Sequence, residues 1–151
     1  MSELDVQLQF NLDPQLQNDT VCLGEFELCE VLLSRDANYP WCILVPKRSG
    51  KTEIHHLALA DREQLIRESC QLAEVMADLF VPDKMNVAAL GNIVAQLHVH
   101  HVARFKDDAA WPNPIWGVCP AIPYSDQELQ SRVQRLTSAL SGSGFTQKCD
   151  I

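Results

Sequence analysis

The sequence predicts an α+β fold, in which helices cover an antiparallel sheet. Three stretches support this prediction. Residues 20–46 hold short apolar runs separated by turn residues, residues 60–82 have helical periodicity, and residues 84–140 combine two further strands with a capped helix. With 151 residues the chain is long enough to bury a core, and we expect one domain over residues 1–151.

The first half of the chain is expected to begin with a polar lead-in over residues 1–19, including a short helix at 14–17. An antiparallel meander follows, with a break near Gly24 and a turn at 34–40. Asp, Asn and Pro in this turn favour the backbone angles that turns require. The three strands of the meander are expected at 20–23, 26–33 and 41–46.

Two longer helices are predicted beyond this meander. The first is long and amphipathic, with Asp61 as its expected N-cap and Pro82 marking its end. The second begins at a capping box formed by Ser125 and Glu128, and its apolar residues recur at helical spacing. Beyond it, residues 142–151 are expected to form a flexible tail.

Between the two helices the chain is expected to form a hairpin and then an irregular segment. Residues 84–90 and 96–104 are the predicted strands, joined by a turn at Gly91–Asn92. The segment Trp111–Gly117 is rich in proline and tryptophan. We expect it to be extended and anchored by its large apolar side chains.

Composition excludes several classes of function. The net charge is −8, whereas binding to nucleic acid or to a membrane surface favours a basic patch, so neither is expected as a partner. The six cysteines are scattered without a Cys-x-x-Cys pair, and the N-terminus lacks the basic and apolar regions of a signal peptide. No stretch has the length of a transmembrane helix. We therefore expect a cytoplasmic protein with reduced thiols.

Three of the five histidines lie within four residues of the predicted strand at 96–104. Alternate side chains of a strand share a face. Gln96, His98 and His100 are therefore expected on one face of the sheet. His101 is expected on the opposite face, where it is packed in the core or lies at an interface and is not catalytic.

Three interpretations of the first face are compatible with the residues. His98 and His100 can be partly buried strand residues whose ring nitrogens bind backbone groups. They can be zinc ligands, with His55, His56 or Cys119 completing the set, although no spacing motif singles any of these out. They can also serve nucleophilic catalysis, because a neutral imidazole attacks activated phosphorus and forms a covalent intermediate. Donors to the phosphate oxygens would then come from Gln96, His100, Asn86, Asn92 and Arg104.

The stretch Gln96–Val102 resembles the signature of the histidine-triad (HIT) family, His-φ-His-φ-His-φ-φ, in which φ is apolar. The segment Leu44–Lys47 resembles the family's strand before its long helix, and Gly91 stands where the family has a glycine in the phosphate-binding turn. Gln-Leu-His-Val-His, with the motifs at Asn86–Asn92 and Trp111–Gly117, resembles a bacterial branch of HIT-like hydrolases with Gln at the first triad position. The resemblance covers roughly residues 20–120.

This resemblance implies a curved antiparallel sheet with one long helix and a C-terminal helix, often in a homodimer. It also implies attack on the α-phosphate of a small nucleotide ester, amide or anhydride, with no cofactor and no metal. By position in the signature, His98 is the covalent nucleophile, His100 contacts phosphate oxygens or the leaving group, and Gln96 takes the first position. The resemblance places the ribose-binding group at Asp36 or, alternatively, at Asn38 of the same loop. Together with Asp36, the donors Asn86, Asn92 and Arg104 named above are the expected nucleotide-binding residues.

The sequence departs from the family pattern at positions that bear on activity. Gln96 forms hydrogen bonds but cannot carry a proton as an imidazolium does. Ile93 stands where many members have a polar phosphate-binding residue, and Arg104 could compensate by pairing with phosphate through two parallel hydrogen bonds.

The function that the resemblance predicts is a hydrolase of phosphoramidate or phosphoanhydride nucleotides, or a nucleotidyl transferase. The alternative is a nucleotide-binding protein with weak or lost catalysis.

Overall fold

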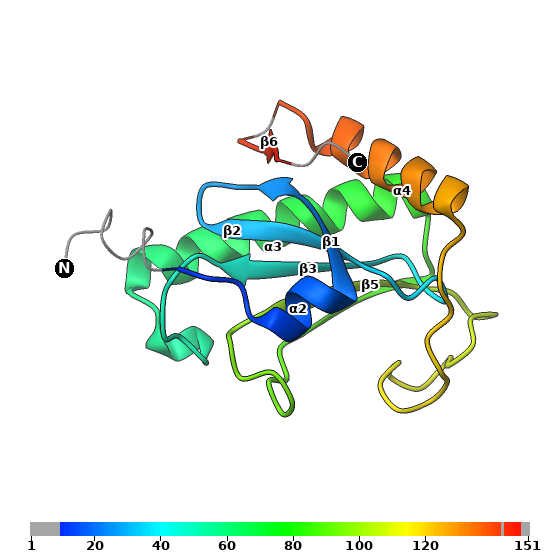
Figure 1. The fold of residues 1–151 in the computed structure, drawn as a ribbon, viewed down its shortest axis with the longest axis horizontal. Coiled ribbons are helices and arrows are strands. Elements are labelled where there is room, and N and C mark those ends of the chain that lie inside the picture. The colour runs from blue at the N-terminus through cyan, green and yellow to red at the C-terminus, as the bar shows by residue number, and fades with distance from the viewer. Residues whose placement is uncertain (1–9, 143, 149–151) are drawn as a thin grey trace.

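The computed structural model describes residues 10–142 and 144–148, and it confirms the predicted α+β class. Six antiparallel strands form a curved open sheet in the order β4-β5-β3-β2-β1-β6 (Figure 1). The strands are β1 (Thr20–Glu25), β2 (Cys29–Ser34), β3 (Trp41–Pro46), β4 (Lys84–Ala88), β5 (Val99–Arg104) and β6 (Thr146–Gln147). The helices are α2 (Pro14–Asp19), the 3₁₀ turn η1 (Ile54–His56), α3 (Leu59–Phe80) and α4 (Asp126–Leu140).

The predicted meander at 20–46 is confirmed, but two strands have other bounds: β2 begins at Cys29 and ends at Ser34 instead of spanning 26–33, and the first strand is longer than expected. β1 does not stop at Gly24 but continues to Glu25, and its register against β2 shifts between Cys22 and Gly24. Gly24 has a φ of +153°, and a Cβ on it would collide with the Thr146 carbonyl and the Phe145 ring. Glycine is therefore required here because β6 lies very close to β1.

The long helix α3 is confirmed, but Asp61 is not its N-cap. The helix begins at Leu59, and Ala58 occupies the cap position without a side-chain hydrogen bond. Asp61 lies in the first turn, where its carboxylate pairs with Arg48 at 2.7 and 3.0 Å. An acidic residue favours a helix start through the dipole as well as through capping, so sequence alone did not separate the two roles.

One face of the sheet packs against α3 and α4 (Figure 1). Leu97, Val99 and Ala103 belong to this core, in agreement with the predicted alternation along the histidine stretch. α4 begins with the predicted capping box, since Ser125 and Glu128 bond each other's backbone N–H. The two helices thus cover the face opposite to the one expected to carry Gln96, His98 and His100.

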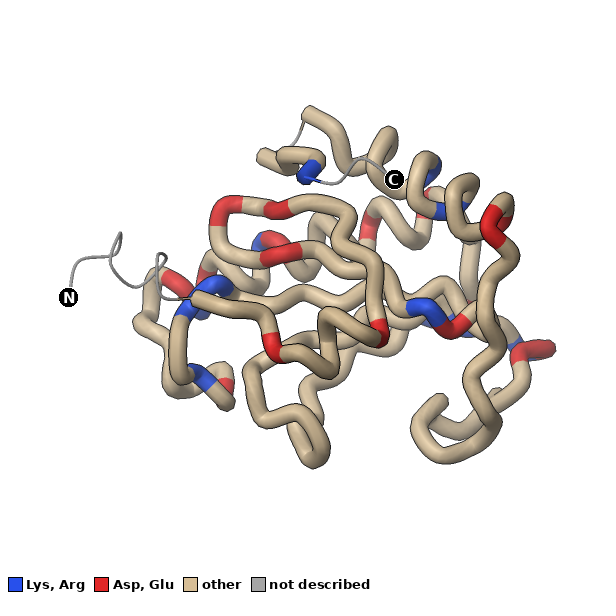
Figure 2. Tube along the Cα trace, in the orientation of Figure 1, with Lys and Arg blue, Asp and Glu red and all other residues tan. Residues whose placement is uncertain are grey.

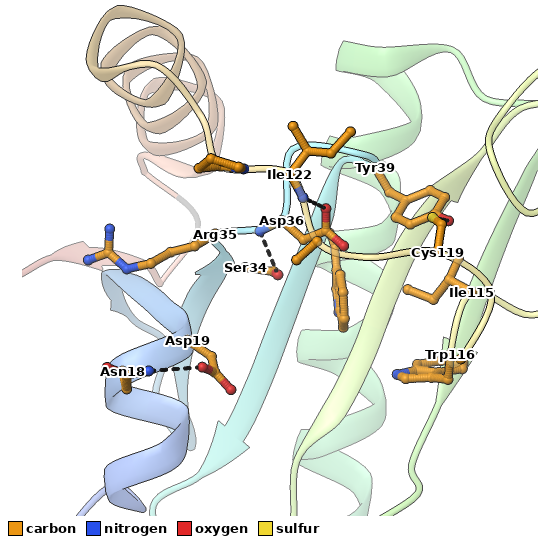
Figure 3. Close-up of a pocket in the computed structure, with 14 residues that line it drawn as sticks. Asn18, Asp19, Ser34, Arg35, Asp36, Tyr39, Ile115, Trp116, Cys119 and Ile122 are labelled. Atoms are coloured by element: carbon orange, nitrogen blue, oxygen red, sulfur yellow. Dashed lines mark hydrogen bonds between the residues drawn. The ribbon is translucent and has the colours of Figure 1, made fainter.

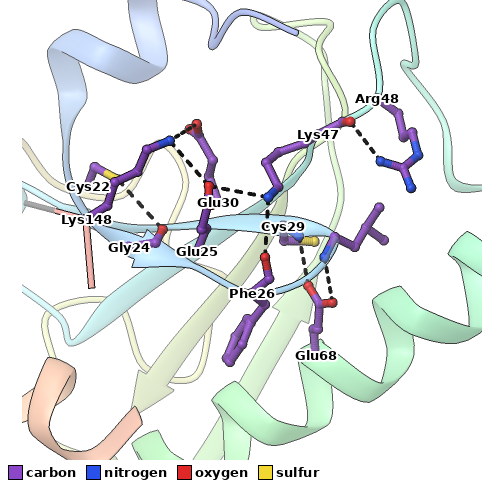
Figure 4. A network of polar contacts seen from close by, with 11 residues as sticks. Cys22, Gly24, Glu25, Phe26, Cys29, Glu30, Lys47, Arg48, Glu68 and Lys148 are labelled. Carbon is purple, nitrogen blue, oxygen red and sulfur yellow. Dashed lines mark hydrogen bonds and ion pairs between the residues drawn. The ribbon is translucent and has the colours of Figure 1, made fainter. Parts of the chain in front are cut away.

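Glu68 of α3 joins this helical layer to the sheet (Figure 4). Its carboxylate is buried and accepts hydrogen bonds from the backbone N–H groups of Leu28 and Cys29 at 2.9 and 2.8 Å. The Gln64 amide donates to the same carboxylate at 2.7 Å. These bonds satisfy backbone donors at the start of β2 that would otherwise be buried without partners.

The other face of the sheet is covered only in part. Leu16 of α2 packs on Leu32, Ile43 and Val45, so α2 lies over β2 and β3. Further along, residues 105–123 cross the same face as an irregular segment, in agreement with the prediction for 111–117 (Figure 1). The sheet surface between α2 and this segment carries the histidines.

The strand that holds the histidines is shorter than predicted. β5 begins at Val99 rather than at Gln96, and β4 ends at Ala88 rather than at Leu90. The two strands pair as predicted, but residues 89–98 connect them as a loop instead of a tight turn at Gly91–Asn92. Loops of this length are set by contacts elsewhere in the fold, which the local turn signal does not report.

The predicted flexible tail is wrong for part of its length. Thr146 and Gln147 form β6, which pairs with Gly24 and Glu25 of β1. Phe145 packs edge-on against Phe26, with ring centroids 5.7 Å apart, and Lys148 contacts the Glu25 carboxylate at 3.3 Å (Figure 4). Residues 143 and 149–151 of the tail, like residues 1–9 of the lead-in, lie outside the described part of the chain.

Candidate active site on the open face of the sheet

His98 lies at the entrance to β5 with one ring nitrogen free to react. Its Nδ1 is 2.7 Å from the backbone carbonyl of Gln96. A carbonyl oxygen only accepts, so Nδ1 carries the ring hydrogen and Nε2 keeps a lone pair. Burial of the side chain fixes the direction of the ring. The arrangement is that of an imidazole nucleophile held in one tautomer.

His100 is beside His98 and is held in the opposite tautomer. The two rings meet edge-on with centroids 4.8 Å apart. The indole Nε1–H of Trp41 donates to His100 Nδ1 at 3.0 Å, so the hydrogen of His100 is on Nε2. Burial, together with the neighbouring His98 and His101, lowers the pKa of His100 to about 3. At neutral pH His100 is therefore an uncharged hydrogen-bond donor.

His101 points to the helical side of the sheet, as predicted. Its Nδ1 donates to the Val99 carbonyl at 3.1 Å, and its Nε2 accepts from the Ser69 hydroxyl of α3 at 2.7 Å. Burial lowers the pKa of His101 to about 4. The residue is part of the core between sheet and helix.

A cavity of ≈ 610 Å³ opens beside His98 and His100. Its walls are α2, β3, the loop residues 90–94 and Trp116 from the irregular segment. Asn92 also lines it, so the structure brings this predicted residue to the two histidines. The volume lies in the range of small-molecule sites.

A second cavity of ≈ 550 Å³ adjoins the first and shares Asp19, Ser34, Trp41 and Trp116 with it (Figure 3). Asp36 lines this second cavity rather than the first. Its Oδ1 accepts hydrogen bonds from the backbone N–H groups of Asn38 and Ile122 at 2.9 and 3.2 Å. Asp36 thus holds the loop at Asn38 and the segment at Ile122 together beside the second cavity.

Gln96 is close to His98 in the chain, but its side chain is occupied elsewhere. Nε2 donates to the Asn11 carbonyl at 2.8 Å, and Oε1 accepts from the Asp13 N–H at 2.9 Å. The Gln96 side chain does not line the cavity beside His98, although both residues line a narrow recess of ≈ 10 Å³. The amide therefore ties the segment before α2 to the loop before β5, and its backbone carbonyl orients His98.

Arg104 and Asn86 do not line either cavity. Arg104 is 1 % exposed, and its guanidinium binds Asp108 through two bonds of 2.8 and 3.0 Å and Asn86 through one of 2.8 Å. Burial opposes ionisation of Asp108, but the bonds from Arg104 and from three backbone N–H groups hold the pKa of this carboxyl well below its usual range. Arg104 is committed to a buried ion pair.

Trp41 and Trp116 are site residues that the sequence did not reveal. Trp41 contributes the hydrogen bond to His100, and Trp116 packs edge-on against both, with centroids 6.3 Å from Trp41 and 5.0 Å from His100. The pairing of β3 with β5 places Trp41 opposite Val102. Had this pairing been predicted, Trp41 would have been expected on the histidine face.

The surroundings of the site are not basic. Figure 2 shows Lys and Arg positions spread over several elements and interspersed with acidic ones.

Within the described residues, no group of three or more His, Cys, Asp and Glu side chains is placed to hold a metal ion. In the same part of the chain, no helix is long and apolar enough to cross a membrane.

Comparison with known proteins identifies the family. Residues 15–107 match the model of the HIT domain. Histidine triad proteins of known structure are similar over almost their whole length. One from Marinobacter aquaeolei is 48 % identical, with 87 % of this chain and 96 % of that one covered and a TM-score of 0.85.

Two further structures agree. A histidine triad protein from Bradyrhizobium japonicum is 40 % identical, covering 87 % of this chain and 98 % of its own, with a TM-score of 0.85. One from Sinorhizobium meliloti is 36 % identical, covering 88 % and 98 %, also with a TM-score of 0.85. No protein of curated function matches the chain. The matched domain model and these structural relatives together show that the chain belongs to the HIT family.

Proposed function

We propose that the protein is a nucleotide hydrolase or nucleotidyl transferase that acts at the α-phosphate through a covalent nucleotidyl-His98 intermediate. HIT-family proteins commonly bind nucleotides, and many hydrolyse them. The observation that carries the proposal for this chain is the tautomer of His98. Its Nδ1–H is bound to the Gln96 carbonyl, so the Nε2 lone pair is free beside a cavity of ≈ 610 Å³.

In the proposed reaction His98 Nε2 attacks the α-phosphorus and displaces the leaving group. Water, or a second acceptor in a transferase, then takes the nucleotidyl group from His98. His100 stabilises the charge that develops on a phosphate oxygen, because its Nε2–H is a donor fixed in place by Trp41. Asn92 is a second donor from the loop that lines the same cavity.

Other predicted residues receive different roles in this proposal. Gln96 positions His98 through its backbone carbonyl and does not contact phosphate, because its amide is bound to the Asn11 and Asp13 backbone. Asp36 shapes the adjoining cavity, which we assign to the part of the substrate furthest from His98. Arg104 and Asn86 support the fold beneath the site.

Mass spectrometry of the stalled reaction tests the proposal. The protein is mixed with a nucleoside 5′-phosphoramidate or a dinucleoside polyphosphate and stopped in alkali, because the phosphorus–imidazole bond is labile in acid. We expect a nucleotidyl adduct on His98 and none in His98→Ala. His101→Gln is the matched control, since it alters a nearby histidine of β5 that points to the other face of the sheet. Turnover in His98→Ala at the wild-type rate would refute the mechanism.

A binding protein without chemistry is the second candidate, and the structure contains an observation that favours it. The first triad position carries an amide that is bound to the backbone, so it supplies no proton to a leaving group. Calorimetry with a nucleoside monophosphate distinguishes the two. Binding without any adduct on His98, for all substrates tried, would assign the protein to this second class.

The proposal also includes a homodimer in the cytoplasm, as the family resemblance and the composition led us to expect. Sedimentation equilibrium of the full chain tests the dimer. A molecular mass of one chain, ≈ 17.0 kDa, across the accessible concentration range would contradict it.

A further inference from the structure

The leaving group decides whether a nucleotide can react at His98. An alkylamine or alcohol cannot depart from phosphorus as an anion, because that anion is too basic, so its departure needs a proton donor. A phosphate, polyphosphate or carboxylate departs as a weakly basic anion and needs none. The proton donors around His98 therefore determine the substrate class.

His100 cannot serve as that acid. The indole N–H of Trp41 only donates, so His100 Nδ1, at 3.0 Å, must hold a lone pair. A proton on this nitrogen would set two N–H groups against each other. Burial also lowers the pKa of His100 to about 3. The residue offers a hydrogen bond from Nε2 but no acidic proton.

Among the residues that the structure describes, the other groups near His98 do not replace it. The Gln96 amide is bound to the backbone on both of its atoms. Asp19, on α2, has both carboxylate oxygens occupied by amide hydrogen bonds, from Asn18 at 3.2 Å and Gln15 at 2.9 Å. Glu53, from the loop before η1, is exposed at the narrow recess beside His98.

In the adjoining cavity, Tyr39, Asp36 and Arg35 lie apart from His98. Tyr39 faces the Cys119 sulfur at 3.4 Å, and burial and Cys119 raise the pKa of its hydroxyl. Asp36 holds backbone N–H groups, and Arg35 extends away from it (Figure 3). None of these residues lines the cavity that contains His98.

We propose that the site is specific for nucleotides whose leaving group departs as a weakly basic anion (phosphate, polyphosphate or carboxylate), and that Trp41 sets this specificity by holding His100 as a neutral donor. This inference rests on the proposed nucleotidyl-His98 chemistry. The Nε2–P bond forms as the bond from phosphorus to the leaving oxygen breaks, and the electron pair leaves with that oxygen. Water then forms a P–O bond, its proton passes to solvent, and the electron pair of the Nε2–P bond returns to His98.

A pair of substrates that differ only in the leaving group tests the specificity. The full-length protein is assayed with a dinucleoside polyphosphate and with the N-alkyl phosphoramidate of the same nucleoside, using adenosine and guanosine in parallel. General acid catalysis contributes about 10²–10⁴-fold. We therefore expect kcat/KM for the phosphoramidate to be lower by at least about 10²-fold.

Trp41→Phe tests the role assigned to Trp41, with Trp111→Phe as the control, since Trp111 does not line the cavity. Losing the indole N–H should release the second tautomer of His100, visible in its ¹⁵N shifts, and raise its pKa by about one unit. The protonated fraction then grows about tenfold. The ratio of kcat/KM for the polyphosphate to kcat/KM for the phosphoramidate should therefore fall about tenfold. A loss of packing would lower both values and leave their ratio unchanged.

The outcomes separate the two levels of the proposal. Phosphoramidate turnover within about tenfold of the polyphosphate rate overturns the specificity while leaving nucleotidyl-His98 intact. Unchanged ¹⁵N shifts and an unchanged ratio in Trp41→Phe overturn the role of Trp41. Absence of any adduct on His98 with both substrates overturns the proposed function, and the specificity with it.

Discussion

Replacing Arg104 is expected to destabilise the fold rather than to weaken nucleotide binding. Arg104 and Asp108 are 1 % and 4 % exposed, and two hydrogen bonds of 2.8 and 3.0 Å join them. Arg104→Met would leave the Asp108 carboxylate buried without its counter-ion. Breaking a buried pair from one side costs about 3–5 kcal/mol. This is a large part of the roughly 5–15 kcal/mol that stabilises a domain.

Urea unfolding measures this loss. With a dependence of about 1–3 kcal/mol per molar urea, the midpoint of Arg104→Met should fall by about 2 M. Arg104→Lys keeps the positive charge but loses the two parallel N–H donors of the guanidinium, so its urea midpoint should lie between those of the wild type and Arg104→Met. Arg67→Met is the control, because Arg67 is exposed on α3 and its loss should change stability by less than about 0.5 kcal/mol.

The pH dependence gives a second measurement of the same pair. The pKa of Asp108 is lowered in the folded protein, so the pair stabilises the fold above the unfolded pKa of about 3.9 and the stabilisation is lost as pH falls through the lowered value. In Arg104→Met the carboxyl can be protonated more easily. The difference in stability between wild type and variant should therefore shrink in acid. A variant with unchanged stability and a raised KM would refute this account and return Arg104 to the nucleotide site.

Three further predictions concern the described core and the edge of the site. The pKa of His101 is lowered to about 4 in the folded protein, so protonation of this histidine in the unfolded chain opposes folding as pH falls from about 6.5 to 4. His101→Gln should therefore reduce the slope of the unfolding free energy against pH in this window by the contribution of about one bound proton. An unchanged slope would contradict this assignment. Gln96→Glu places a carboxylate oxygen against the Asn11 carbonyl where the wild type has an N–H donor. It should therefore lower the urea midpoint more than Gln96→Ala, which only removes hydrogen bonds worth about 0.5–1.5 kcal/mol each. The reverse order would mean that the amide bonds do not hold in solution. Gly24→Ala should lower the melting temperature, because the new Cβ would collide with the Thr146 carbonyl. The expected loss in the free energy of unfolding is about 1–3 kcal/mol. An unchanged melting temperature would show that β6 does not pair with β1.

The sequence alone determined the features that depend on near neighbours in the chain. Period-two alternation separated His98 and His100 from His101, because a strand turns successive side chains to opposite faces. The capping box at Ser125 and Glu128 located α4, because both partners lie within one helical turn. The spacing of the histidines likewise pointed to the family, which the domain match then confirmed.

The tertiary structure decided what depends on partners far apart in the sequence. The Gln96 amide binds Asn11 and Asp13, 85 and 83 residues away, and Trp41 reaches His100 across 59 residues. No local pattern specifies these pairings, because they arise only when β3 lies beside β5 and α2 lies against the loop before β5. Thus the resemblance to the HIT signature pointed to His98 as the candidate nucleophile, while long-range packing set the tautomer of His100 and the hydrogen bonds of the Gln96 amide.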